Sequence, residues 1–250
     1  MTNNSVLMVQ MNELGKDYGD FTALQSLSLE IKQGEVFGFL GPNGAGKTTT
    51  IRLLTGLLEA SRGNVFVKGQ DVSLFPQETK SIIGYIPDQP FLYDKLTGDE
   101  YIAFVAGLWG MERKEAIKRA IPYLEQFRLT DVRKNLVEGY SHGMKQKLVM
   151  TAAFVHEPEL LVVDEPTVGL DPRSVLTIKE MFRKHAEGGG TVFLSTHSLD
   201  VAETVCDRIG ILNKGRMIAL GTMAQLRKEA ASDGGNLESV FLTLTEEEEL

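Results

Sequence analysis

The segment Gly41–Thr48 reads Gly-Pro-Asn-Gly-Ala-Gly-Lys-Thr and matches the pattern G-x-x-x-x-G-K-[ST]. Its glycines let backbone N–H groups turn inward around phosphate oxygens, and a helix starting at Lys47 would add the positive end of its dipole. Lys47 is placed to reach the β- and γ-phosphates, and the hydroxyl of Thr48 to hold Mg²⁺. A glycine-rich turn without a ligand is the alternative. An apolar strand before the loop and a helix after it favour the phosphate site.

Two adjacent carboxylates, Asp164 and Glu165, follow a second apolar run at Leu160–Val163. Acids at the end of a buried strand are costly unless they meet a cation or move a proton. In phosphate-loop NTPases an acid at this place supports Mg²⁺, so Asp164 is the predicted metal ligand. Because side chains alternate along a strand, Glu165 points elsewhere and could polarise an attacking water. The alternative is that both acids only cap the strand.

Two further features could contact phosphate. Ser141 is a natural N-cap for an apolar helix, Gly143 permits close backbone approach, and helix N-termini attract anions. His197 follows the apolar run Thr191–Ser195 and is therefore expected at the carboxyl edge of the sheet, where open α/β folds bind ligands. Plain capping by Ser141 and a structural role for His197 are the alternatives.

The elements that position these residues follow from the hydrophobic pattern. Turn-bounded apolar runs predict strands, and these lie at Val6–Met11, Phe21–Ile31, Val36–Leu40, Val65–Val67, Ile82–Ile86, Leu160–Val163, Thr191–Ser195, Arg208–Leu212 and Arg216–Leu220. Helices are expected at Lys47–Leu58 and Ser174–Glu187, and a helical insert occupies 94–156. Alternating strands and helices predict an α/β fold with a mainly parallel sheet.

Composition narrows the class of protein. The chain has 250 residues with 26 Lys and Arg against 34 Asp and Glu, so its net charge of −8 argues against general nucleic-acid binding. A single cysteine, Cys206, excludes an internal disulfide or a cysteine-cluster metal site and suits a reducing cytosol. No signal peptide is visible, and no apolar stretch approaches the ~20 residues of a membrane helix. We expect a cytoplasmic location.

These motifs, in this order and at this spacing, resemble the nucleotide-binding subunit of an ATP-binding cassette (ABC) transporter over about residues 6–245. The resemblance implies one ABC domain at 1–245, in which 1–93 and 157–222 form the ATPase core with an antiparallel β subdomain. Residues 94–156 then form the helical signature subdomain, and 223–250 a C-terminal helical segment with an acidic tail. The implied activity is ATP hydrolysis with Mg²⁺.

The resemblance also assigns site residues. The catalytic residues are Glu165, His197 and Gln89; the nucleotide-binding residues are Tyr18, Gly41, Pro42, Asn43, Gly44, Ala45, Gly46, Lys47, Thr48, Thr49, Ser141 and Gly143; the metal ligands are Thr48, Asp164 and Gln89. Tyr18 is the aromatic residue expected to stack on adenine.

Two motifs depart from the family pattern. The signature motif usually reads Leu-Ser-Gly-Gly-Gln, but Tyr140, His142 and Met144 stand here for its Leu, first Gly and Gln. The Q-loop normally places Gln directly after its strand, whereas Asp88 holds that position and Gln89 follows it. Either side chain could reach Mg²⁺ or the water. We favour Gln89.

The implied partners are a second copy of the chain or a homologous subunit, bound head to tail around two ATP molecules, and a separate transmembrane permease. The chain would then lie on the inner face of the membrane through the permease. The segments Leu237–Thr245 and Gly143–Lys147 resemble bacterial ABC-2-type subunits, many of which are exporters. The permease groove would include Phe91, Leu92, Tyr93 and Tyr101, although packing within the helical subdomain explains these residues equally well.

The rival class is a soluble ABC-type ATPase of translation or DNA maintenance. Such proteins usually carry two cassettes or long coiled-coil insertions, whereas this chain has one cassette, no sustained heptads and an acidic balance. A nucleotide-binding regulator without turnover is disfavoured because Glu165 and His197 are both present.

Overall fold

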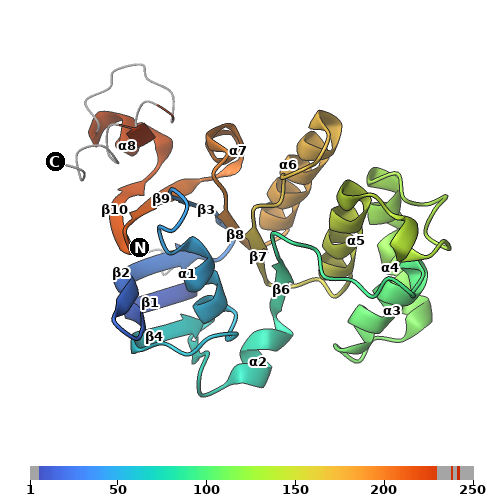
Figure 1. The fold of residues 1–250 in the computed structure, drawn as a ribbon, viewed down its shortest axis with the longest axis horizontal. Helices are drawn as coiled ribbons and strands as arrows, with labels where there is room; N and C mark the ends of the chain where they lie inside the picture. Colours follow the sequence, from blue (N-terminus) through green and yellow to red (C-terminus); the bar gives the residue numbers. More distant parts are fainter. Residues whose placement is uncertain (1–5, 230–237, 239–240, 243–250) are drawn as a thin grey trace.

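The computed structural model describes residues 6–229, 238, 241 and 242. Two β-sheets lie beside a group of helices, which stands on the right in Figure 1. Most of the expected C-terminal segment beyond Glu229, including the acidic tail, lies outside the described residues.

The smaller sheet is antiparallel and has the order β2-β1-β4-β5. Its strands are β1 (Leu7–Tyr18), β2 (Phe21–Lys32), β4 (Arg62–Val67) and β5 (Gln70–Asp71). The first strand continues well beyond the expected end at Met11, because register shifts interrupt its pairing with β2 without ending it. Glu13, at φ 47°, lies within one of these irregular stretches, so the apolar alternation used for the prediction is lost there.

The larger sheet has the order β10-β9-β3-β8-β7-β6, and only the β9–β10 pair is antiparallel. Its strands are β3 (Val36–Leu40), β6 (Ile83–Ile86), β7 (Leu160–Asp164), β8 (Thr191–Ser195), β9 (Arg208–Asn213) and β10 (Arg216–Gly221). Every residue of β3, β7 and β8 is buried. Because these three strands are parallel neighbours, the loops that follow them meet at one edge of the sheet.

In the part of the chain that the structure describes, the two sheets are accompanied by the helices α1 (Lys47–Leu54), α2 (Pro76–Ser81), α6 (Pro172–Glu187), α7 (Leu199–Val205) and α8 (Met223–Glu229). The expectation that the first helix reaches Leu58 is wrong: Thr55 is the C-cap, and Gly56 adopts a left-handed φ of +64°. The sequence pattern also missed α2 and α7, which are too short to show a helical period.

The helical insert lies between β6 and β7 and consists of α3 (Gly98–Gly107), α4 (Arg113–Gln126), a 3₁₀ turn at Val137–Gly139 and α5 (His142–Val155). A capping box starts α3, because the Thr97 hydroxyl accepts from the Glu100 N–H while the Glu100 carboxylate accepts from the Thr97 N–H. All of these elements fall within the expected bounds 94–156.

Of the three apolar clusters among the described residues, two cover the faces of the parallel sheet. One joins α3, α4, α5 and α6 to one face of the parallel sheet, through residues such as Leu124, Val155 and Leu161. The other joins the opposite face to α1 and the antiparallel sheet, with Phe193 packed against Phe37 and Phe39 at ring distances of 5.9 and 5.2 Å. The central strands are therefore covered on both faces, as the continuous apolar runs predicted.

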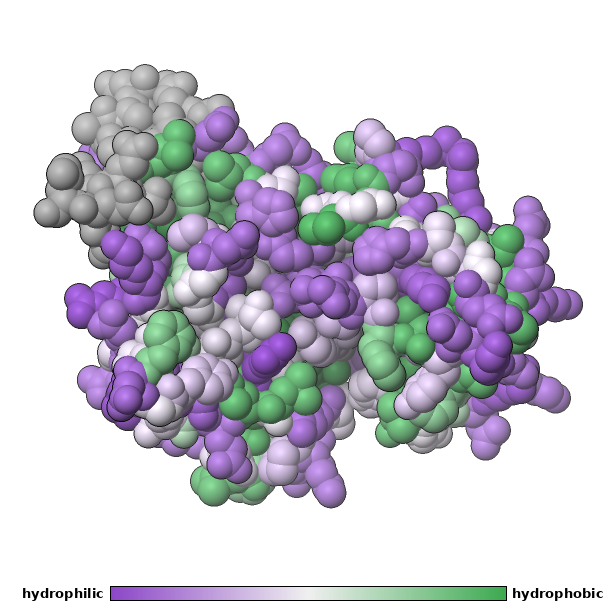
Figure 2. All heavy atoms as spheres, viewed as in Figure 1, coloured by the Kyte–Doolittle hydropathy of each residue, from purple (hydrophilic) through white to green (hydrophobic). Residues whose placement is uncertain are grey.

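The surface in view is mainly hydrophilic, with apolar residues gathered over the helical insert and over the loop leading into α2 (Figure 2). Within the described residues, no helix combines the length and the apolar character that crossing a bilayer requires.

Candidate functional site

The phosphate loop joins β3 to α1, and local contacts require glycine at two of its positions. Gly46 has a φ of +110°, and a Cβ there would lie 2.7 Å from the carbonyl oxygen of Ala23. A Cβ on Gly41 would lie 2.3 Å from the carbonyl oxygen of Leu212. Any side chain at either position would push the loop away from the neighbouring backbone.

Lys47 is buried at the base of this loop. Its Nζ donates to the carbonyl oxygens of Gly41 at 2.7 Å and Pro42 at 3.2 Å. Burial lowers the pKa of the ammonium group, while the nearby carboxylates of Glu165 and Asp164 act in the opposite direction. These contacts place a positive charge inside the loop, where phosphate oxygens could replace the two carbonyls.

Thr48 and Asp164 face each other across the site, with the threonine hydroxyl donating to the Asp164 carboxylate at 3.3 Å. Asp164 is 2% exposed, and burial raises the pKa of its carboxyl, with further increases from the negative charges of Asp88 and Glu165. A cation would relieve this concentration of negative charge. Hydroxyl and carboxylate oxygens are ligands that suit Mg²⁺.

No group of three or more His, Cys, Asp or Glu side chains arranged to hold a metal occurs in the described part of the chain. An ion held by Thr48 and Asp164 would therefore share its coordination with other oxygens. This arrangement fits Mg²⁺, which usually binds through one or two protein oxygens together with phosphates and waters.

Glu165 lies just beyond β7 in a left-handed conformation, at φ 47°. Its N–H donates to the Ser195 carbonyl at 2.9 Å, which ties it to the end of β8. Its Oε2 lies 2.7 Å from Nδ1 of His197 and accepts from the His197 N–H at 3.2 Å. The carboxylate and the imidazole thus form one pair, in which a proton could pass to Glu165 while His197 fixes its orientation.

Two adjoining cavities collect these side chains. The first, of about 340 Å³, is lined by Tyr18, Phe21, Ala23, Asn43, Gly44, Gly46, Lys47, Thr48, Thr49, Asp88, Asp164 and Glu165. The second, of about 530 Å³, is lined by Asn43, Asp88, Gln89, Pro90, His142, Lys145, Glu165, Val168 and His197. Asp88 borders both cavities and Gln89 only the second. The assignment of the Q-loop role to Gln89 stays a prediction.

The predicted signature residues, Ser141 and Gly143, lie away from the phosphate loop's cavity. Ser141 is the N-cap of α5, and its hydroxyl accepts from the Met144 N–H at 3.3 Å, so the predicted cap is confirmed. Neither Ser141 nor Gly143 lines the first cavity of its own chain. A Cβ on Gly143 would come within 3.3 Å of the Leu170 side chain, so this segment packs beside the loop before α6.

Phe21 and Ala23 line the first cavity but are not among the residues predicted from the sequence. Phe21 is the pairing partner of Tyr18 across the turn at Gly19 and Asp20, and both aromatic rings are exposed. Phe21 and Ala23 lie two residues apart at the start of β2, so their side chains are on the same face of the strand. The alternation of side chains along β2 could have identified Phe21 and Ala23, but only if the register of the β1–β2 hairpin had been known.

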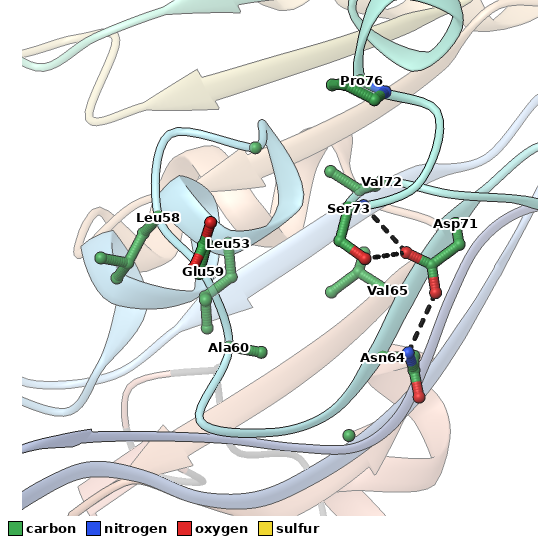
Figure 3. A pocket seen from close by; sticks show the side chains of 12 residues that line it. Leu53, Leu58, Glu59, Ala60, Asn64, Val65, Asp71, Val72, Ser73 and Pro76 are labelled. Atoms are coloured by element: carbon green, nitrogen blue, oxygen red, sulfur yellow. Dashed lines mark hydrogen bonds between the residues drawn. The ribbon is translucent and has the colours of Figure 1, made fainter.

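Another cavity, of about 380 Å³, lies between α1, β4 and β5 and does not contain these residues (Figure 3). One of its two carboxylates, Asp71, accepts from the backbone N–H and hydroxyl of Ser73 and from the side chain of Asn64. These donors fix the Asp71 carboxylate within the structure around β5.

Comparison with known proteins was consistent with this arrangement. A family model described as ABC transporter matches residues 24–168. The linearmycin resistance ATP-binding protein LnrL of Bacillus subtilis is 41% identical over 226 residues, covering 90% of this chain and 73% of LnrL.

Solved structures agree with these sequence matches. An ATP-binding subunit of an ABC transporter superposes with a TM-score of 0.90 at 33% identity, covering 95% of this chain and 99% of that chain. CbiO1 of Clostridium perfringens, part of the ABC transporter complex CbiONQ, gives a TM-score of 0.77 at 26% identity, covering 89% of this chain and 91% of CbiO1.

Proposed function

This chain belongs to the ABC transporter family and is an ATP-binding subunit that hydrolyses ATP to power transport, and from that premise we propose how its residues divide the work. Its relatives include ATP-binding proteins of the drug-resistance, ABC-2 exporter type. They do not favour the alternative of an ATPase acting in translation or DNA maintenance.

ATP occupies the first cavity. Adenine stacks on the exposed ring of Tyr18, and the phosphates lie in the loop Gly41–Gly46 against the N-terminus of α1. Lys47 exchanges the carbonyls of Gly41 and Pro42 for the β- and γ-phosphates. This placement is supported by the lining of the first cavity, which brings together the ring of Tyr18, the phosphate loop and the carboxylates of Asp164 and Glu165.

Glu165 is the general base of the reaction. A water oxygen attacks the γ-phosphorus, its proton passes to the Glu165 carboxylate, and the bond from the γ-phosphorus to the bridging oxygen of ADP breaks. His197 holds Glu165 in position through the 2.7 Å contact and lies near the transferred phosphate. Thr48 and Asp164 would hold Mg²⁺, which when bound neutralises charge on the phosphates; Asp88 or Gln89 orients the water.

The second partner of ATP is another copy of the chain or a homologous subunit, arranged head to tail. Ser141 and Gly143 begin a helix whose positive end suits an anion, yet they lie outside the ATP cavity of their own chain. A phosphate offered by the partner would satisfy them. Hydrolysis removes that phosphate and opens the dimer.

ATP-binding subunits of this family work with transmembrane permeases. The permease contact of this chain lies on exposed aromatic residues at the entry to the helical insert. Tyr101 of the predicted groove is instead buried in the apolar cluster, and Phe104 of α3 extends the exposed group. The rings of Phe91, Tyr93 and Phe104 form consecutive edge-to-face pairs at 5.9 and 5.2 Å, and Phe91 is 78% exposed. The chain is thereby held on the inner face of the membrane, and the likeness to LnrL supports an exporter.

The test is the variant Glu165→Gln, which removes the base but keeps the size of the side chain. We expect ATP binding to persist, steady-state hydrolysis to be abolished and a dimer to accumulate with ATP in size-exclusion chromatography. Glu180→Gln, an exposed position on α6, is the matched control and should hydrolyse ATP normally. Undiminished hydrolysis by Glu165→Gln would refute the assignment of the base.

A further inference from the structure

Gln146 is a buried amide that makes a hydrogen bond through only one of its two polar atoms in the described part of the chain. It lies in the second turn of α5 and is 1% exposed. Its Nε2 donates to the carbonyl oxygen of Pro87 at 3.3 Å. Its Oε1 is enclosed, and no donor within the described residues reaches it. The Pro87 contact sets the orientation of the amide, because a flipped amide would place two oxygens together.

The contact joins two parts of the site that are distant in sequence. Pro87 directly follows β6 and precedes Asp88 and Gln89, which line the cavities around Glu165. Gln146 belongs to the helix that Ser141 caps. A buried acceptor without a donor costs free energy that an apolar side chain of the same shape would avoid. Stability alone therefore gives no reason for glutamine at this position.

A donor for the free oxygen lies in the same loop. The N–H of Gln89 takes part in none of the hydrogen bonds found in the described part of the chain. The Asp88 N–H is not suitable, because it shares a trans peptide group with the Pro87 carbonyl and points the opposite way. A small movement of the loop against α5 would bring the Gln89 N–H to Oε1 while Nε2 keeps the Pro87 carbonyl. The amide would then clasp the loop with both of its groups.

We propose that Gln146 is a positioning residue for ATP hydrolysis, which holds the Pro87–Gln89 loop in its active arrangement through this second hydrogen bond. The inference rests on the proposed function, in which Asp88 or Gln89 orients the attacking water. Gln146 itself lines neither of the two cavities at the site. It acts through the loop and links the loop position to the helix that carries the signature motif.

The test is Gln146→Met in the full chain, which keeps the length of the side chain and removes both amide groups. We expect kcat for ATP to fall about tenfold, while the Kd for ATP, measured by titration calorimetry in EDTA, stays within about twofold. The melting temperature should be unchanged or higher, because the unpaired oxygen is gone.

Thr151→Val is the matched control on the same helix. Thr151 is fully buried, but its hydroxyl donates only to the Lys147 carbonyl of α5, at 2.9 Å. We expect its kcat to match that of the wild-type chain. An unchanged kcat in Gln146→Met overturns the proposal, and so does a fall in kcat that Thr151→Val shares or that accompanies an equivalent loss of thermal stability.

The variants Asp88→Ala and Gln89→Ala distinguish a failure of the proposal about Gln146 from a failure of the proposed role of the loop in ATP hydrolysis. If either variant lowers kcat and Gln146→Met does not, the inference about Gln146 is wrong and the role of the loop stands. If neither lowers kcat, the role assigned to the loop is wrong and the proposal about Gln146 is overturned with it.

Discussion

Replacing Glu165 with glycine is expected to leave the protein more stable than replacing it with alanine. Both substitutions remove the carboxylate and its contacts with His197, so these losses cancel when the two variants are compared. What remains is the backbone, which the structure holds at a φ of 47°.

The magnitude follows from two opposing terms. A residue with a Cβ pays about 1–2 kcal/mol to adopt the left-handed conformation, and glycine does not. The unfolded chain is more flexible with glycine than with alanine, and this lowers the stability of the glycine variant by roughly 0.5–1 kcal/mol. The glycine variant should therefore be more stable by about 0.5–1 kcal/mol. For a chain of this size this difference corresponds to roughly 1–4 °C in melting temperature.

Urea unfolding of both variants, extrapolated linearly to water, measures this difference if the two m-values agree. Neither variant should hydrolyse ATP, so activity does not interfere with the comparison. An alanine variant as stable as the glycine variant, or more stable, would refute the argument. A positive result would show that the backbone at the proposed base is held in a costly conformation by the surrounding structure.

Three further predictions concern binding and pH. Lys47→Ala should weaken ATP binding by about 10–100-fold, because charge-assisted contacts worth about 1.5–3 kcal/mol are lost, and unchanged affinity in titration calorimetry would contradict this. Phe21→Ala should weaken ATP binding about fivefold, because one aromatic contact is worth ~1 kcal/mol. If the variant binds ATP as tightly as the wild-type chain does, Phe21 does not contact adenine. His156 stacks on Trp109 at 4.0 Å, and burial lowers the pKa of its imidazole to about 4. As pH falls from about 6.5 to 4, His156 is protonated in the unfolded chain but not in the folded chain. The free energy of unfolding therefore declines by up to about 1.4 kcal/mol per pH unit over this range. Urea unfolding at pH 7 and pH 5 should show a smaller decline in His156→Phe, and equal declines would contradict the assignment.

The phosphate loop was predictable because its chemistry and its sterics require the same residues. Gly41 and Gly46 leave no room for a Cβ beside neighbouring backbone, so the pattern that marks a phosphate site also marks the close contact. The strand ends carrying Asp164 and His197 were predictable for a related reason. Parallel neighbours in a sheet end at the same edge, and continuous apolar runs identify them.

Other features depend on contacts that a linear pattern does not contain. The position of the Asp88 and Gln89 loop depends on α5, through the contact of Gln146 with Pro87, some 59 residues away. The pairing of Tyr18 with Phe21 depends on the tight turn at Gly19 and Asp20, and the bulges of β1 hide from the sequence pattern that the strand continues to this turn. Short helices such as α7 (Leu199–Val205) are stabilised by packing rather than by propensity, and so carry little signal of their own.

The strand order also has a consequence for synthesis on the ribosome. The strand that leads into the phosphate loop, β3, pairs with β8 and β9, both of which are translated long after it. At translation rates of about 5–20 residues per second, the intervening ~150 residues take roughly 8–30 s to make. During that interval β3 is an apolar segment without its neighbours, exposed to aggregation and to chaperones. The ATP site is thus assembled only after β8 and β9 have been translated, and nascent chains that stop before β8 cannot form it.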